Sequence, residues 1–97
     1  MEKFAILATL KSQPGKEEIV LEFLKSALPL AIGEPDTIRW YAAQIGPSTF
    51  CIFDTFNTED GRAAHLDGPI AAALMDNAST LLAEEPTINI AKIIALK

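Results

Sequence analysis

Two patterns of apolar positions alternate along the chain. Short runs that are dense in apolar, β-branched and aromatic residues are typical of strands, and they occupy residues 3–11, 37–45, 49–56 and 87–96. Between them, apolar residues recur at steps of three and four, which is typical of amphipathic helices, over residues 16–33 and from 69 to about 84. A short helix is also expected from Thr58 through Leu66, because Thr58 can act as its N-cap. The pattern therefore predicts the order β-α-β-β-α-β, with a break inside the second helical region.

Turn and cap residues support these boundaries. Gly46-Pro47-Ser48 is a short reversal that would join the second and third strands as a hairpin. Thr58 has the side chain of an N-cap, and Pro69 suits the first position of a new helix. Pro29 cannot donate to the helix ladder, so we expect it either to end the first helix or to kink it.

A split pair of βαβ halves of this length predicts an α+β, ferredoxin-like fold, a four-stranded antiparallel sheet with the helices on one face. The strands, however, are apolar on both faces. In the third strand Phe50, Ile52 and Phe56 share one face, while Cys51 and Phe53 occupy the other. Because the helices cover only one face, we expect the other to pack against a second copy, sheet against sheet, in a symmetric homodimer and dimeric α+β barrel.

Composition sharpens this interpretation. A chain of 97 residues forms one domain, expected over residues 1–97, without room for a nucleotide- or flavin-binding domain. Its hydrophobic fraction of 49% is high for a small monomer, which also favours a partner subunit. The net charge of -5 and the lack of a basic stripe argue against nucleic acid and membrane surfaces as partners. One cysteine, Cys51, suits a cytoplasmic protein and is expected to be a small buried hydrophobe.

Few residues can carry chemistry. With one histidine and one cysteine the chain has no Cys/His zinc site, and its glycines follow no phosphate-loop spacing, so no metal and no bound cofactor are predicted. His65 titrates near neutrality, and it is either a helix-terminal cap or a catalytic base. Asp54, a carboxylate among phenylalanines, would orient His65, or it reaches water or backbone N–H groups at the strand end. Trp40 and Tyr41 lie on opposite faces of their strand, where aromatic residues are usually core.

Three segments together resemble the antibiotic biosynthesis monooxygenase family: QPGKEE, GEPDTIRWYAAQ and FDTFNTEDGRAAHLDGP. The resemblance runs from about Phe4 to Lys97, and the FDTF…HL segment is its most specific part. It implies a dimeric α+β barrel of ferredoxin-like subunits. The family includes oxygenases that use neither metal nor flavin, haem-degrading enzymes, isomerases and proteins of unknown activity. The haem-degrading branch fits poorly, because its Asn, Trp and His positions fall at Ala8, at Phe56 and within 72–74.

The resemblance implies a cofactor-independent monooxygenase that oxidises a small electron-rich phenol or quinol with O2. His65 would be the general base, and Asp54 would orient it. The pocket would lie between helices and sheet, and its expected lining is Phe4, Ile6, Trp40, Phe50, Ile52 and Phe56. Two alternatives remain open at the level of the sequence: a non-catalytic ligand-binding or structural dimer, and an isomerase of small molecules that would use His65 without consuming O2.

Overall fold

The centre of the molecule is one sheet of four antiparallel strands. The computed structural model describes residues 1–97. The strands are β1 (Phe4–Lys11), β2 (Thr37–Gln44), β3 (Thr49–Phe56) and β4 (Thr87–Lys92). Their order across the sheet is β2-β3-β1-β4, so the first and third strands are central and the other two are edges. This is the ferredoxin-like arrangement that the sequence predicts.

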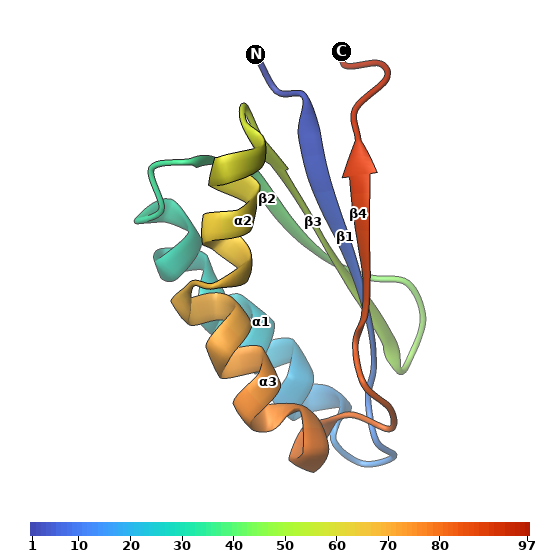
Figure 1. Ribbon diagram of the computed structural model, residues 1–97. Coiled ribbons are helices and arrows are strands. Elements are labelled where there is room, and N and C mark those ends of the chain that lie inside the picture. Colours follow the sequence, from blue (N-terminus) through green and yellow to red (C-terminus); the bar gives the residue numbers. More distant parts are fainter.

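Three helices lie together on one side of this sheet (Figure 1). They are α1 (Glu17–Ile32), α2 (Glu59–Leu66) and α3 (Pro69–Leu81). The main core forms where α1 and α3 meet the two central strands; its buried members are Ala8, Leu10, Val20, Leu24, Phe50, Ile52, Leu74, Leu81 and Leu82. A smaller cluster of Ala27, Ala31 and Ile70 packs against Trp40. The apolar face of each helix therefore covers the same face of the sheet.

Pro29 does not end α1, since the helix continues to Ile32. The Pro29 carbonyl still accepts a hydrogen bond from the Gly33 N–H at 3.1 Å, and Ala31 is buried beside Ala27. Burial of this last turn keeps the chain helical past the proline.

Two other elements are shorter than their apolar patterns suggest. The helix expected to reach about residue 84 ends at Leu81, because Leu82 turns to an extended conformation and bridges Ser12. The last strand, expected over 87–96, ends at Lys92. Its partner β1 begins at Phe4, opposite Lys92, so the ladder has no further strand to pair with. Apolar residues beyond that point are outside the sheet.

The register places alternate rows of side chains on opposite faces of the sheet. Trp40, Asp54 and Ile6 lie opposite one another across β2, β3 and β1, on the face beneath the helices. The next row, Tyr41, Phe53 and Leu7, lies on the other face, which no helix covers (Figure 1). Tyr41 is 55% exposed there and Phe53 37%. No helix has both the length and the apolar character needed to cross a membrane.

Candidate functional site

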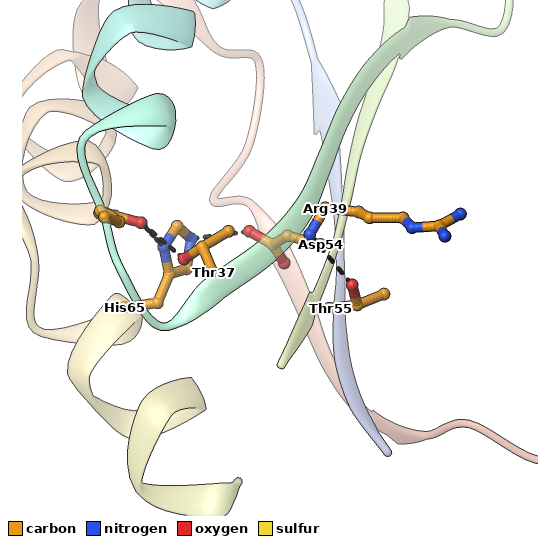
Figure 2. A network of polar contacts seen from close by, with 6 residues as sticks. Thr37, Arg39, Asp54, Thr55 and His65 are labelled. Carbon is orange, nitrogen blue, oxygen red and sulfur yellow. Dashed lines mark hydrogen bonds and ion pairs between the residues drawn. The ribbon is translucent and has the colours of Figure 1, made fainter. Parts of the chain in front are cut away.

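The main polar feature beneath the helices is a histidine held between two carboxylates. Nε2 of His65 lies 2.7 Å from Oδ2 of Asp54, and Nδ1 lies 2.6 Å from Oε1 of Glu34. Figure 2 shows the His65 ring and the Asp54 side chain pointing toward each other across the gap between α2 and the sheet. His65 is 8% exposed and Asp54 1%. We call Asp54, His65 and Glu34 the carboxylate–histidine trio.

Each member of the trio comes from a different element. Asp54 belongs to the central strand β3, and His65 lies in the last turn of α2. That helix begins where the Thr58 side chain accepts a hydrogen bond from the Gly61 N–H at 2.9 Å, as an N-cap does. The ring of Phe56 lies 5.4 Å from the imidazole, centroid to centroid. Strand, cap and aromatic contact together fix the orientation of the imidazole.

Glu34 is the member that the sequence patterns do not reveal. It lies in the connection between α1 and β2, where its Oε1 also accepts a hydrogen bond from the Thr37 hydroxyl at 2.8 Å. A Cβ on Gly68 would lie 3.2 Å from Oε2 of Glu34, so the absence of a side chain at Gly68 leaves space for this carboxylate. Glu34 is 31 residues from His65 and is one of 13 acidic residues. No local spacing distinguishes it from the others, because its partner His65 is distant in the sequence.

The two carboxylates favour the protonated form of His65. Burial by itself lowers the pKa of the imidazole, but the hydrogen bonds and negative charges of Asp54 and Glu34 outweigh burial. The pKa of His65 is therefore raised above its ordinary value of 6.5. In the protonated state both ring nitrogens donate, one to each carboxylate, and neither is left to accept a proton from elsewhere.

Two buried polar atoms, on residues that are partners in the β2–β3 register, have no hydrogen-bond partner in the protein. They are Oδ1 of Asp54 and the indole Nε1 of Trp40. Trp40 and Asp54 are directly opposite in the β2–β3 register and share the face beneath the helices. One atom is an acceptor and the other is a donor, and each unsatisfied buried group costs about 1–3 kcal/mol. The fold therefore carries an unmet hydrogen-bonding capacity at this point.

An open, mostly apolar cavity of about 410 Å³ lies between α1 and β2. Leu21, Leu24 and Leu28 line it from the helix, and Trp40, Ala42 and Phe50 line it from the sheet. Of the six residues expected to line a pocket, Trp40 and Phe50 do so. The other four lie elsewhere: Ile6, Ile52 and Phe56 are buried in the protein interior, and the Phe4 ring packs under the Arg62 guanidinium at 5.1 Å.

A second, smaller cavity of about 140 Å³ adjoins the Glu34 end of the trio. Glu34, Thr37, His65 and Gly68 are among its lining residues. The Glu34 side chain is 17% exposed, against 1% for Asp54. The trio thus runs from a closed end at Asp54 to an end near solvent at Glu34.

No protein-family model and no curated protein sequence matches the chain. Solved structures do. The NE2512 protein of Nitrosomonas europaea, of unknown function, is 50% identical with a TM-score of 0.97, over 100% of this chain and 94% of its own. A second protein of that organism, described as a candidate antibiotic biosynthesis monooxygenase, is 19% identical with a TM-score of 0.83, over 95% of this chain and 90% of its own. Another antibiotic biosynthesis monooxygenase is 14% identical with a TM-score of 0.79, over 95% and 99% of the two chains.

Identity and coverage with the first of these structures are high enough to establish common descent, and the other two share the arrangement of strands and helices. The chain therefore belongs to the family of the NE2512 protein and has the fold of the antibiotic biosynthesis monooxygenases.

Proposed function

We propose that the chain is a monooxygenase that uses no bound cofactor and oxidises a small electron-rich phenol or hydroquinone with O2. The observation that carries this proposal is Asp54, a buried carboxylate that has one unpaired oxygen and is held by His65 through the other. Its cross-strand neighbour Trp40 lines an apolar cavity. Such a carboxylate can deprotonate a phenol, and apolar walls can hold O2 beside the resulting anion. The fold shared with antibiotic biosynthesis monooxygenases supports the same reaction class.

The sequence suggests His65 as the general base and Asp54 as the residue that orients it; in this proposal Asp54 is the base and His65 orients it. Both ring nitrogens of His65 contact carboxylates, so the imidazole has no free position for a substrate proton. Oδ1 of Asp54 has no partner and is the atom that accepts the proton. His65 is then a positioning residue: its Nε2–H holds Oδ2, which leaves Oδ1 as the basic site.

The reaction balances without an external reductant. Asp54 takes the phenolic proton, and the phenolate gives one electron to O2. The resulting radical and superoxide couple at a ring carbon, Asp54 returns its proton to form a hydroperoxide, and loss of water leaves a quinone. One oxygen atom enters the product, the other leaves as water, and the substrate supplies all the electrons. What the protein must supply is a dry cavity and a base of suitable strength.

We also propose that the uncovered face of the sheet packs against a second copy of the chain. Tyr41, Phe53 and Leu7 form an apolar row on that face, and two of these three side chains are more than one third exposed in the single chain. Self-association would bury this row. Light scattering at micromolar concentration should give twice the chain mass of 10.5 kDa; the mass of one chain would contradict the proposal.

The test of function is oxygen uptake with a panel of hydroquinones and anthrone-like phenols. We expect Asp54→Asn to lower kcat/KM by about 100-fold or more, because general-base catalysis contributes about that factor. The matched control is Asp60→Asn, which changes an exposed aspartate on α2 and should leave the rate unaltered. Replacing His65 by Gln should also lower the rate and should shift the pH profile, which a merely structural contact would not do.

Three outcomes would contradict the proposal in different ways. Equal rates for the wild type and Asp54→Asn would remove the base from the mechanism. Turnover that persists without O2 would indicate an isomerase. Tight binding of a phenol with no turnover under air would indicate a ligand-binding protein in which the trio only links α2 to the sheet.

A further inference from the structure

We propose that Trp40 and Asp54 together recognise a single hydroxyl group of the ligand. The indole N–H of Trp40 donates to the hydroxyl oxygen, and the hydroxyl donates to Oδ1 of Asp54. The inference rests on the proposed function only in placing the ligand in the cavity between α1 and β2; it concerns recognition, and it holds whether or not a reaction follows.

The first argument is chemical complementarity. Of the buried side-chain nitrogen and oxygen atoms, two have no partner, and they are one donor, Trp40 Nε1, and one acceptor, Asp54 Oδ1. A hydroxyl is a group that both accepts and donates, so one hydroxyl satisfies both atoms. An ether oxygen could serve only Trp40, and a bare aromatic ring could serve neither.

The second argument is position. Trp40 and Asp54 lie opposite each other on adjacent antiparallel strands, where Cβ atoms are about 4.5–5.5 Å apart. An oxygen placed between two such side chains can reach both at ordinary hydrogen-bond distances of about 2.7–3.0 Å. Asp54 cannot turn Oδ1 toward the helices without releasing His65, because Oδ2 is held by Nε2 at 2.7 Å.

The third argument concerns access. Trp40 lines the cavity of about 410 Å³, while its nitrogen and Oδ1 of Asp54 are both closed off from solvent. A hydroxyl therefore reaches them only if the indole ring is displaced toward the cavity, which has room for it. The two unpaired atoms make the closed arrangement costly, and a bound hydroxyl removes that cost. Trp40 thus serves both as a gate to Asp54 and as a specificity-determining residue.

The experiment compares three probes of nearly equal shape under argon: 1-naphthol, 1-methoxynaphthalene and naphthalene. The chain has one tryptophan, so the indole N–H gives a single signal in a nitrogen–proton NMR spectrum. We expect 1-naphthol to bind about tenfold or more tightly than the methyl ether, since the lost hydrogen bond is to a charged acceptor. We expect the Trp40 signal to move downfield with 1-naphthol and to stay near its free position with naphthalene.

Two variants separate the two contacts. In Trp40→Phe the preference for 1-naphthol over naphthalene should fall at least threefold, with naphthalene affinity kept. In Asp54→Asn, with the amide nitrogen at the Oδ1 position, the preference for 1-naphthol over its ether should disappear, because the amide donates instead of accepting. The control Asp60→Asn should keep the full preference. If Trp40→Phe does not fold, the wild-type probe series and Asp54→Asn still test whether the site recognises a hydroxyl group.

Equal affinities for 1-naphthol and its ether in the wild type, an unmoved indole signal, or no binding of any probe would overturn the inference. The results also separate it from the proposed function. Selective binding of 1-naphthol with no oxygen uptake for any phenol would refute the oxygenase and keep the recognition site. Oxygen uptake without discrimination between 1-naphthol and its ether would do the reverse.

Discussion

Asp54 and Thr55 are consecutive residues of β3, both buried, and each joins a polar network on its own face of the sheet. Asp54 points beneath the helices and holds His65, whereas Thr55 points to the uncovered face (Figure 2). There the Thr55 hydroxyl contacts the Glu2 carboxylate and accepts a hydrogen bond from the Arg39 N–H at 3.2 Å. Arg39 Nε lies 3.3 Å from the same carboxylate, but the arginine side chain is 49% exposed.

The difference between these networks lies in how water is excluded. Beneath the helices every member of the carboxylate–histidine trio is mostly or fully buried, so charges interact strongly and an unpaired atom is costly. On the uncovered face the arginine remains in contact with solvent, which screens the ion pair. The same strand therefore carries a network suited to chemistry on one side and a structural network on the other.

The largest expected difference is in stability. Asp54→Leu removes one partner of a buried charged pair and should lower the free energy of unfolding by about 3–5 kcal/mol. Thr55→Val at the adjacent position removes hydrogen bonds to the Arg39 backbone N–H and to the Glu2 carboxylate. It should cost less, about 1.5–3 kcal/mol. Urea unfolding of both variants measures the two values. Equal losses would mean that the two faces do not differ in the way described.

The second test uses pH. The pKa of His65 is raised in the folded protein, so its contribution to stability is fully present below about pH 6.5, the ordinary value, and is lost as pH rises through the folded pKa. The difference in unfolding free energy between the wild type and His65→Gln should therefore shrink from pH 6 to pH 9. Arg39→Met, on the other face, should show no such trend in this range. A difference that grows with pH would contradict the assignment.

The third test acts on Glu34 through its neighbour. A Cβ in Gly68→Ala would lie 3.2 Å from Glu34 Oε2 and 3.2 Å from the His65 carbonyl oxygen. We expect a loss of about 1 kcal/mol and a lower pKa for His65, because the displaced carboxylate stabilises the imidazolium less. NMR titration of the single histidine measures the pKa. Gly33→Ala is the matched control, since its Cβ would meet only ordinary contacts at 3.6 Å.

The smallest effect is expected for the ion pair on the uncovered face. Arg39→Met should change the unfolding free energy of the chain by about 0–1 kcal/mol, as for other exposed pairs. If a second copy covers this face, the same variant should alter the dimer dissociation constant more than it alters the stability of one chain. Sedimentation of the variant across a concentration series measures that constant. An unfolding loss as large as that of Asp54→Leu would refute the comparison.

Much of the fold could be predicted because its signals are local. Alternation and three-to-four spacing depend on neighbouring residues, so the order of strands and helices and the helix starts at Thr58 and Pro69 follow from short segments. The ends of α3 and β4 could not be predicted, because they depend on Ser12 and on where β1 begins. Those partners are distant in the sequence.

In the candidate site, too, some features could be predicted from the sequence and others depend on contacts between distant elements. Composition and strand pattern show one histidine, one tryptophan and a carboxylate among phenylalanines, and they led to the hypothesis that Asp54 orients His65. Three features follow from the fold alone: the place of Glu34 beside His65, the position of the cavity between α1 and β2, and the lack of partners for Asp54 Oδ1 and Trp40 Nε1 on two residues that face each other across the strands. The physical reason is that hydrogen bonding and burial depend on which elements pack together. Composition and spacing along the chain do not specify the packing of elements that are distant in the sequence.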